Sequence, residues 1–340
     1  MLNSKDKYNV AVVGATGIVG ESLLDIIFTR NFPVKNLHAV ASQKSKGSKV
    51  KYGNKLLTVE ALDEFDFSGV DIAFFSAGGS ISKQYVPVAT KHNCIVIDNT
   101  SEYRYVDNIP LIVPEVNGDE IVKYTATNII ANPNCSTIQM LVALKPIHDL
   151  YSIKSINVST YQAVSGSGKD GVEELLEQSS SYINQRIIDK KVYPKQIAFN
   201  VIPFVDSFLE NKYTREEMKM VWETQKILDK SISVNPTAVR VPVLVGHAES
   251  IYIETNNEID IQTILSEFEK FKGITVVDDP ENLDFPTPFE QGHGTDNVYV
   301  GRLRKCLDKK NALNLWVVAD NVRKGAALNS IQIAEHLIRS

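Results

Sequence analysis

Apolar residues in the first third of the chain form short runs that alternate with stretches of helical periodicity. Tyr8–Val13 reads as a strand, breaks into a glycine turn, and leads into an amphipathic stretch at 21–30. A helical pattern also covers 82–92. The further strands expected here are Asn36–Ser42, Val70–Ala77 and Cys94–Asn99. Strands alternating with helices favour right-handed βαβ crossovers, so this part is predicted to be a doubly wound α/β domain with a mostly parallel sheet.

The pattern changes after about Pro133. A long helix is expected at Ser136–Leu150, followed by an extended segment at 152–164, and two more helices begin near Gly168 and Thr214. Shorter strands are expected at Ala238–Val245, Ser250–Thr255, Asn297–Arg304 and Leu313–Ala319. This arrangement is typical of a mixed or antiparallel sheet with helices on one side, and the last twenty residues read as an amphipathic helix.

Composition narrows the class of protein. The chain has 340 residues, and at roughly 100–200 residues per domain it is expected to form two domains. It is 43% hydrophobic and 23% charged, with a net charge of -5 and basic residues spread along its length, so a disordered chain and a nucleic-acid or anionic-membrane binder are excluded. A small-molecule site is the expectation.

The cysteines and the N-terminal residues of the chain indicate the cellular compartment in which the protein is expected. Cys94, Cys135 and Cys306 lie far apart with no CxxC spacing, which argues against a disulfide framework and a structural zinc site. No metal site is expected. The N-terminal residues are polar, and no apolar run approaches the roughly 20 residues of a membrane span. The protein is therefore expected in the cytoplasm.

Three glycines follow the first strand in a GxxGxxG pattern. Gly14, Gly17 and Gly20 close a strand and open a helix, the context in which glycines let a pyrophosphate approach the helix N-terminus. A glycine-softened turn without a ligand is the alternative interpretation.

The loop after the second expected strand indicates which dinucleotide is bound. An NAD site would place Asp or Glu about 20 residues beyond the glycines, but no carboxylate occurs between Asn31 and Val59. Lysines stand at positions 35, 44, 46, 49, 51 and 55. Their charge suits the 2′-phosphate of NADP, which is predicted over NAD, although a solvated charged loop would give the same pattern.

Cys135 differs from the other cysteines. It lies in a polar turn, NPNCST, directly before a helical run, and a helix N-terminus favours the nucleophilic thiolate. A buried, unreactive thiol is the alternative. A nucleophilic cysteine beside a nicotinamide suggests a thioester route between an aldehyde and an activated acid, which needs a histidine to handle protons. His247 and His293 both lie among glycines, and spacing does not choose between them.

These motifs resemble those of the bacterial aspartate-β-semialdehyde dehydrogenase family over essentially the whole chain. The matching segments, in order, are GATGIVG (14–20), SAGGS (76–80), DNTSEYR (98–104), VPEVN (113–117), NPNCST (132–137), YQAVSGSG (161–168), TREEMK (214–219), RVPVLVGHAE (240–249) and DNVRKGAA (320–327). The resemblance implies a Rossmann-type NADP-binding domain at 1–132 with about 321–340. It also implies an α+β catalytic and dimerisation domain with a mixed sheet at 133–320, and a C-terminal helix that returns to the first domain.

The resemblance also implies an activity. In this family NADPH reduces L-4-aspartyl phosphate to L-aspartate 4-semialdehyde and phosphate, on the route to lysine, diaminopimelate, threonine and methionine. Cys135 is then the nucleophile and His247 the acid/base group, with Gln162 orienting the acyl intermediate. Arg240 is expected to bind the substrate carboxylate and Glu216 its ammonium group, while Arg104 and Lys219 bind phosphate.

The resemblance extends to the cofactor and the assembly. The expected cofactor contacts are Gly14, Thr16, Gly17, Ile18, Val19, Gly20, Lys44, Ser45, Ser165, Gly166 and Asn321. Lys44 stands where many relatives carry arginine, and lysine lacks the bidentate geometry of a guanidinium, so some use of NAD is expected. The family forms homodimers, some pairing into tetramers.

Other functions fit parts of the same pattern. A reductase of N-acetyl-glutamyl phosphate and a phosphorylating glyceraldehyde phosphate dehydrogenase also use a cysteine beside a nicotinamide. A redox sensor that binds NADP without turnover is a further alternative. A capping box is expected at Thr214 and Glu217, which places Glu216 and Lys219 near one helix face, where a simple surface ion pair is the plain interpretation.

Overall fold

A computed structural model describes residues 5–339, which form two compact units. The first unit runs to Asn134 and includes the residues from Ala326 onward, and the second is Cys135–Gly325. Residues 1–4 and 340, which belong to the predicted first domain and its C-terminal helix, lie outside the described part. No helix within 5–339 combines the length and the apolar character that a membrane span requires.

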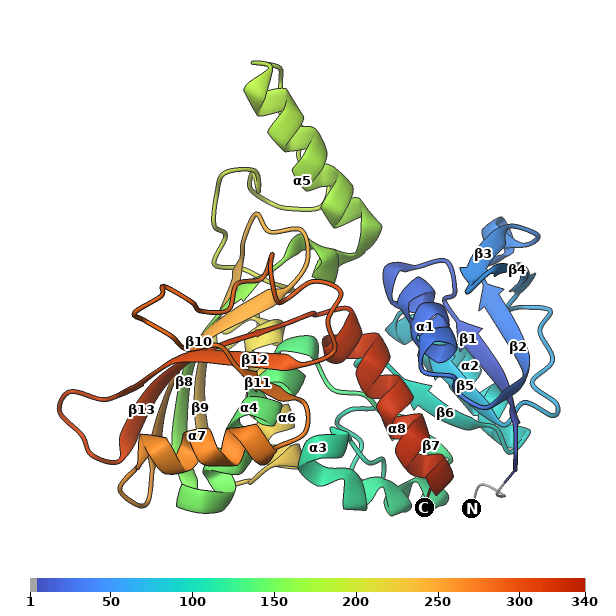
Figure 1. The fold of residues 1–340 in the computed structure, drawn as a ribbon. Coiled ribbons are helices and arrows are strands. Elements are labelled where there is room, and N and C mark those ends of the chain that lie inside the picture. The colour runs from blue at the N-terminus through green and yellow to red at the C-terminus, as the bar shows by residue number, and fades with distance from the viewer. Residues whose placement is uncertain (1–4, 340) are drawn as a thin grey trace. The chain divides into compact units, whose positions relative to one another are not determined.

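The first unit is built on a seven-stranded sheet with the order β3-β4-β2-β1-β5-β6-β7 (Figure 1). Its strands are β1 (Tyr8–Val13), β2 (Val34–Ala41), β3 (Lys49–Tyr52), β4 (Lys55–Ala61), β5 (Ile72–Phe75), β6 (Ile95–Asp98) and β7 (Ile129–Ala131). Its helices are α1 (Ile18–Thr29), α2 (Gly79–Lys91), α3 (Pro114–Asn117), α8 (Leu328–Arg339) and the 3₁₀ segments η1 (Gln43–Ser45) and η2 (Gly118–Ala126). All neighbouring strands are parallel except β3 and β4, which form an antiparallel hairpin.

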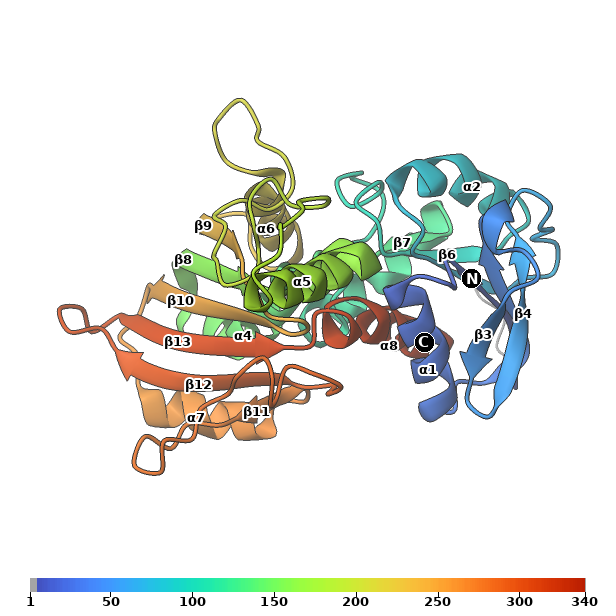
Figure 2. The same cartoon turned by 90° about the horizontal axis from the view of Figure 1, so that it is seen from above.

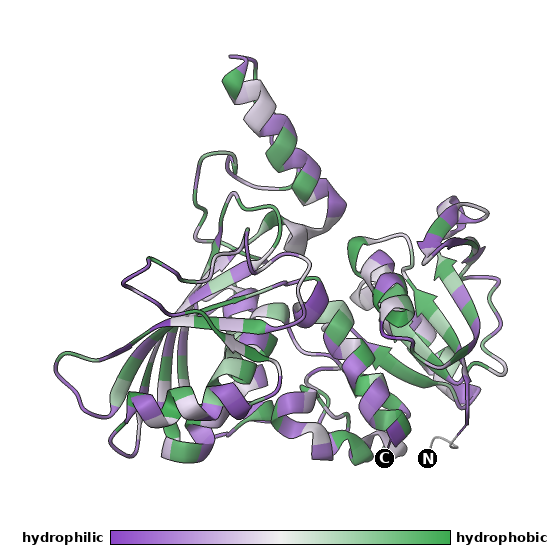
Figure 3. Cartoon of the chain, viewed as in Figure 1, coloured by the Kyte–Doolittle hydropathy of each residue, from purple (hydrophilic) through white to green (hydrophobic). Residues whose placement is uncertain are grey.

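The strand pattern of this unit follows from burial. β5 and β6 are buried along their whole length, as parallel strands between helices require, and the sheet is largely hydrophobic (Figure 3). The doubly wound domain is therefore confirmed, with β1 at its predicted bounds. The expected strand at Asn36–Ser42 instead begins at Val34 and ends at Ala41. The β3–β4 hairpin is a further element that the sequence analysis missed.

The second unit is built on a six-stranded mixed sheet with the order β11-β12-β13-β10-β8-β9 (Figure 2). Its strands are β8 (Ile153–Gln162), β9 (Ser233–Arg240), β10 (His247–Thr255), β11 (Ile274–Val276), β12 (Val298–Lys305) and β13 (Ala312–Ala319). Its helices are α4 (Cys135–Tyr151), α5 (Gly168–Ile183), α6 (Arg215–Ile227), α7 (Ile261–Lys270) and the 3₁₀ segment η3 (Val164–Ser167). The β8–β9 and β11–β12 pairs are parallel and the other pairs are antiparallel.

Helices α4, α6 and α7 pack against this sheet, whereas α5 extends away from it (Figure 1). Along β10 the residues from His247 onward at every second position are buried, and those between them from Ser250 onward are half-buried. The second set shares its face with Tyr161 and Trp316, whose rings lie 5.4 Å apart. One face of the sheet is therefore covered by helices, and the other carries partly exposed aromatic side chains.

Two strands of this unit and the terminal segment of the chain differ from the prediction by more than one residue. The strand expected at Ala238–Val245 is β9, which ends at Arg240 and contains Pro236; a proline is tolerated there because β9 is the edge strand of the sheet. β10 begins at His247 instead of Ser250. The terminal segment is not one helix, because a π-helical turn η4 (Arg323–Ala327) precedes α8, which does belong to the first unit as predicted.

Candidate active site

The ends of three neighbouring strands bring predicted site residues together in the second unit. Gln162 ends β8 and Arg240 ends β9, and the two residues are paired in the parallel register. His247 begins β10, and the pairing of Ala248 with Tyr161 places it at the same end of the sheet. Since these residues are distant along the chain, the sheet is what assembles them.

Cys135 is the first residue of α4, which begins one residue before the predicted start at Ser136, and its side chain is half-buried. Gly325 approaches it closely: a Cβ atom added at Gly325 would lie 2.7 Å from the Cβ of Cys135. Only glycine leaves room for the cysteine side chain at this point. The next residue, Ser136, is fully buried, and its Oγ accepts a hydrogen bond from Gln162 Nε2 at 3.0 Å.

Gln162 connects the strand ends to helix α6. Its Nε2 also donates to Glu216 Oε1 at 3.2 Å, and Glu216 Oε2 accepts from Lys219 Nζ at 2.9 Å. Lys219 donates equally to Asp206 Oδ2 at 2.9 Å. Burial lowers the pKa of Lys219, but Glu216 and Asp206 outweigh this effect and hold its pKa above the ordinary value. Lys219 is therefore a half-buried ammonium whose charge is offset by two carboxylates.

The start of α6 is fixed by local chemistry. Thr214 accepts a hydrogen bond from Glu217 N at 3.2 Å, and the Glu217 side chain accepts from Thr214 N at 2.6 Å, which forms the predicted capping box. Glu216 and Lys219 then lie three residues apart on one face of the first turn, where they form the ion pair. The Glu216 side chain is only 6% exposed, so the surface ion pair considered above is excluded.

Arg240 is buried, and its Nη1 donates to the carbonyl of Ala163 at 2.6 Å. That contact holds one edge of the guanidinium against the loop after β8. A Cβ atom added at Gly166 in the same loop would lie 3.0 Å from this nitrogen and 3.5 Å from His247 Nε2. The absence of a side chain at Gly166 thus leaves space beside both Arg240 and His247.

His247 is fully buried, and its Nδ1 accepts a hydrogen bond from the backbone N–H of Ala163 at 3.0 Å. Burial lowers its pKa to about 3, and the positive charge of Arg240 acts in the same direction. The ring is therefore neutral at physiological pH and carries its proton on Nε2. Within residues 5–339, Nε2 has no hydrogen-bond partner, so this proton is available to a ligand.

Asn321 links the predicted cofactor contacts of this unit. It exchanges hydrogen bonds with the Ser165 hydroxyl at 3.0–3.1 Å, and its Oδ1 accepts from Gly246 N at 2.9 Å. Gly246 has φ +92°, a conformation that favours glycine, and it directly precedes His247. Asn321 therefore fixes the loop that carries Ser165 and Gly166 to the turn that carries His247.

The glycine turn lies in the first unit, at the carboxyl ends of β1, β2 and β5. A cavity of about 310 Å³ opens there, lined by Val13, Gly14, Thr16, Gly17, Ala41, Ser42, Leu62, Ser76, Ala77 and Ile81. Gly14 has φ +93°, and a Cβ atom at this position would lie 2.9 Å from the Ser76 backbone. Helix α1 begins at Ile18, so its first N–H groups face this turn. The geometry fits a dinucleotide pyrophosphate.

A carboxylate from another segment, Glu64 after β4, lies against the lysine-rich loop. Glu64 accepts from Lys46 at 2.5 Å and from Gln43 at 2.8 Å. Lys44 and Ser45 lie in η1 directly after β2, and Lys44 is exposed and forms no ion pair within residues 5–339. Lys44 is therefore a cation in this loop that remains open to a ligand.

Arg104 also lies in the first unit. It is buried, and its Nη2 donates to the Asn99 carbonyl at 2.8 Å. Burial raises the pKa of the nearby Asp98, while Arg104 is one of the groups that lower it. The predicted partnership of Arg104 with Lys219 stays a prediction.

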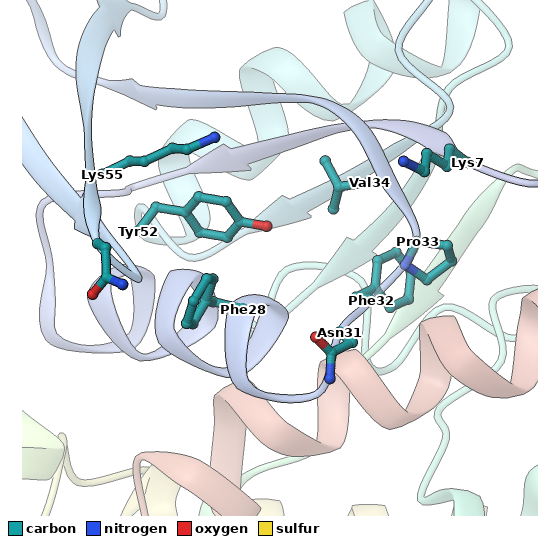
Figure 4. Close-up of a pocket in the computed structure, with 9 residues that line it drawn as sticks. Lys7, Phe28, Asn31, Phe32, Pro33, Val34, Tyr52 and Lys55 are labelled. Carbon is teal, nitrogen blue, oxygen red and sulfur yellow. The ribbon is translucent and has the colours of Figure 1, made fainter.

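A second hollow of the first unit is unrelated to the glycine turn (Figure 4). It has a volume of about 610 Å³ and is lined mainly by Phe28, Phe32, Tyr52, Lys7 and Lys55. It lies at the amino ends of β1 and β2, whereas the glycine turn lies at the carboxyl ends of these strands. The two cavities are therefore separate.

Sequence reasoning missed two residues that shape the site. Asp206 shares Lys219 with Glu216, and Gly325 packs against Cys135. Asp206 lies in an irregular segment with no periodic signal. Gly325 belongs to the segment DNVRKGAA that carried the family resemblance, and a glycine inside a helical pattern was a signal of close backbone approach.

Family models match both units. Residues 9–124 match "Semialdehyde dehydrogenase, NAD binding domain", and residues 144–324 match "Semialdehyde dehydrogenase, dimerisation domain". The chain is thus similar to semialdehyde dehydrogenases over most of its length.

Individual proteins show the same similarity. The chain is 52% identical to an aspartate-semialdehyde dehydrogenase of Shewanella violacea over 334 residues, covering 98% of each chain. A crystal structure of aspartate semialdehyde dehydrogenase II from Vibrio cholerae, complexed with ASA, superposes with a TM-score of 0.97 at 50% identity and 99% coverage of both chains. An NADP complex of the enzyme from Candida albicans shares the fold, with a TM-score of 0.75, 23% identity and coverage of 97% and 98%.

Proposed function

The chain belongs to the aspartate-semialdehyde dehydrogenase family, and on that premise we propose that it reduces L-4-aspartyl phosphate to L-aspartate 4-semialdehyde with release of phosphate. The chain is an oxidoreductase with a nucleotide-binding domain. The relatives described above do not favour an N-acetyl-glutamyl phosphate reductase or a non-catalytic sensor.

One observation carries the proposal. Around the strand ends of a single unit, the chain gathers a cysteine at a helix N-terminus, a neutral histidine with a proton to donate, an arginine and a buried glutamate. These groups match the features of an amino-acid acyl phosphate: an electrophilic carbonyl, a carboxylate and an ammonium group. The set has the chemistry of acyl transfer through sulfur.

The first step is attack of the Cys135 thiolate on the carbonyl carbon of the acyl phosphate. A C–S bond forms, the C–O bond to phosphate breaks, and phosphate leaves with that electron pair. Cys135 is at the N-terminus of α4, where the free backbone N–H groups and the helix dipole carry partial positive charge. This charge favours the thiolate over the thiol. The product on the protein is a thioester.

The second step takes the thioester to the aldehyde. When bound, the reduced nicotinamide supplies the hydride for this step. His247 holds its proton at Nε2 and can donate a hydrogen bond to the oxygen of the acyl carbon, which becomes negative in each tetrahedral state. Cleavage of the C–S bond then releases the aldehyde and restores the thiolate. Because the neutral His247 already holds its proton at Nε2, it acts mainly as an acid rather than as a base.

Substrate recognition follows from charge. Arg240 donates one N–H to Ala163, and its remaining donors suit the planar α-carboxylate. Glu216 suits the ammonium group, and Gln162 orients the acyl group beside Ser136. Phosphate binding is assigned to Lys219 and Arg104. Because Lys219 already meets two carboxylates, it contributes to that binding only as part of a charge network.

We propose NADP as the cofactor. The support is the cavity at the glycine turn (Gly14–Gly20, with Thr16, Ile18 and Val19) and the available cation at Lys44 beside Ser45. In the second unit, the Ser165–Gly166 loop and Asn321 are the proposed contacts of the nicotinamide half. Because Lys44 lacks the bidentate geometry of an arginine at this position, we expect the protein also to use NAD to some extent.

We propose a homodimer formed by the aromatic face of the six-stranded sheet. That face carries Tyr161, 37% exposed, beside Trp316, and it belongs to the segment that matches a dimerisation domain. Light scattering of the wild type and of Ser250→Arg, a half-buried position on this face, tests the assignment; an unchanged dimer mass in the variant would exclude it.

A cytoplasmic location stays a prediction. Its support is that none of Cys94, Cys135 and Cys306 forms a disulfide.

The function is tested by following nicotinamide absorbance with semialdehyde, phosphate and either NADP⁺ or NAD⁺. We expect phosphate-dependent reduction of NADP⁺, a rate that falls by at least about 10³-fold in Cys135→Ala, and a covalent adduct on the Cys135 peptide by mass spectrometry. Cys306→Ala serves as the matched control, because Cys306 lies outside the site. A near-normal rate in Cys135→Ala would refute the thioester route.

A further inference from the structure

A second pair of buried side chains, Gln139 and Glu249, lies next to Cys135 and His247 on the same two elements. Gln139 is one helical turn after Cys135, and Glu249 is two residues after His247. Gln139 follows Cys135 by four residues in α4, which places both on the same face of the helix. Glu249 follows His247 by two residues in β10, which places both on the same face of the strand. α4 packs against β10, so the helix that carries the thiol and the strand that carries the imidazole meet here.

Neither side chain of this pair reaches solvent. Gln139 and Glu249 are both 0% exposed. Gln139 Nε2 donates to the backbone carbonyl of His247 at 3.5 Å. Within residues 5–339, Gln139 Oε1 and both carboxyl oxygens of Glu249 have no well-formed hydrogen bond. The strand neighbours of Glu249 are Thr160 and Val317, neither of which is charged.

A carboxylate in such surroundings would be strongly unfavourable. Burying an ionised carboxylate without a cation is so unfavourable that such groups keep their proton instead. Burial raises the pKa of Glu249 well above its usual range, and the adjacent Gln139 amide offsets only part of this rise. A neutral carboxylic acid has one O–H donor. Gln139, whose side chain interacts with the Glu249 carboxyl group, has an amide oxygen, Oε1, that lacks a donor within residues 5–339.

We propose that Glu249 and Gln139 form a neutral hydrogen-bonded link, in which the Glu249 O–H donates to Gln139 Oε1 and Gln139 Nε2 donates to the His247 carbonyl. The link connects the first turn of α4 to the first residues of β10. Glu249 is therefore a positioning residue that fixes the thiol of Cys135 relative to the imidazole of His247. This inference rests on the proposed roles of those two residues.

Three variants test the link. Glu249→Gln keeps a donor and an acceptor in the same shape, whereas Glu249→Leu and Gln139→Leu each remove the link. We expect Glu249→Gln to keep kcat within about threefold, and each leucine variant to lower kcat about 10–100-fold, as sub-ångström misplacement of reacting groups does. KM should change less than about threefold, because Gln162, Arg240 and Glu216 are untouched.

The double variant Gln139→Leu/Glu249→Leu tests whether the two residues act together. If both residues act through one link, the double variant loses no more kcat than either single variant. Equal and multiplicative losses would show that the residues act separately and would overturn the proposal. An equal loss of kcat in Glu249→Gln and Glu249→Leu would also overturn it, because the carboxyl group itself would then be required.

Counting the active sites distinguishes a positioning role of Glu249 and Gln139 from a role in fold stability alone. Rates are normalised to the Cys135 thiols that react with iodoacetamide, so partial unfolding does not count as lost kcat. Leucine variants with a lower melting temperature but a normal kcat per reactive thiol would overturn the proposal. If Glu249→Leu does not fold, Gln139→Leu against Glu249→Gln still decides it. Activity in Cys135→Ala would instead overturn the proposed function, a result distinct from each of these.

Discussion

The backbone N–H of Ala163 donates a hydrogen bond to His247 Nδ1 at 3.0 Å, which fixes the neutral tautomer of the histidine. Protonation of Nδ1 would set two N–H groups against each other, in addition to the cost of a buried charge near Arg240. The same contact that prepares Nε2 as a donor therefore makes the folded chain sensitive to acid.

We expect this histidine to destabilise the fold below pH 6.5. Its pKa is about 3 in the folded state against 6.5 in the unfolded state, so between these values the unfolded chain binds more protons. At pH 5 the group should reduce the free energy of unfolding by about 2 kcal/mol relative to pH 7.5. Urea unfolding of wild type and His247→Gln at both pH values measures this difference, with His92→Gln, an exposed position, as control. An equal pH dependence in wild type and His247→Gln would show that the folded chain does not hold His247 neutral below pH 6.5.

Glu216 is expected to act mainly in substrate binding. Glu216→Gln keeps the side-chain shape and the contact with Gln162 but removes the charge that suits the ammonium group. The KM for the semialdehyde should rise about 10–100-fold with a smaller effect on kcat, the range for one lost charge-assisted hydrogen bond. Steady-state kinetics check this, and the exposed Glu210→Gln should leave both constants unchanged. A fall in kcat with unchanged KM would contradict the assignment.

The loop after β2 is expected to select the cofactor. Lys44→Ala with Ser45→Asp removes an available cation and adds a carboxylate, which repels the 2′-phosphate and suits a ribose hydroxyl. The ratio of kcat/KM for NADPH over NADH should fall about 10–100-fold. Lys46→Ala is the control, since Lys46 already pairs with Glu64. An unchanged ratio in the double variant would show that these lysines are a solvated surface.

Local signals predicted much of the fold and site. β1, the start of α4 within one residue of the predicted Ser136, and the capping box at Thr214 each depend on residues within a few positions of each other. The β3–β4 hairpin also had a local signal, the two-residue Gly53-Asn54 turn, with Gly53 at φ +56°.

Other features depend on residues brought together only by the fold. The register that pairs Gln162 with Arg240 sets where β9 ends, and no pattern near Arg240 shows it. Pro236 argues against a strand unless one knows that β9 is an edge. The two carboxylates around Lys219 likewise include Asp206, 13 positions away. Long-range register is therefore what the sequence did not provide.

Gly325 is expected to be intolerant of a side chain. A Cβ atom there would lie 2.7 Å from the Cβ and 3.2 Å from the Cα of Cys135, so the first turn of α4 would have to shift. Gly325→Ala should lower kcat at least about tenfold, because a misplaced nucleophile loses its alignment. Alkylation of Cys135 should slow, while labelling of Cys306 in the same protein serves as the internal control. Unchanged labelling of Cys135 with unchanged kcat would show that the helix adapts freely.

The buried Glu249 carboxyl is expected to make the wild type lose stability as pH rises. Its pKa is raised in the folded state by burial, so above pH 4.5 the unfolded chain releases a proton that the folded chain keeps. The free energy of unfolding should fall by up to about 1.4 kcal/mol per pH unit until the folded-state pKa is reached. Glu249→Gln lacks this group and should be more stable than wild type at pH 7, with the difference vanishing near pH 4.5. Urea unfolding at pH 4.5, 6 and 7.5 gives the two slopes; Glu210→Gln, at an exposed position, should reproduce the wild-type slope. If wild type and Glu249→Gln instead show the same slope between pH 4.5 and 7.5, the folded state holds a charged Glu249, and the neutral link to Gln139 cannot exist.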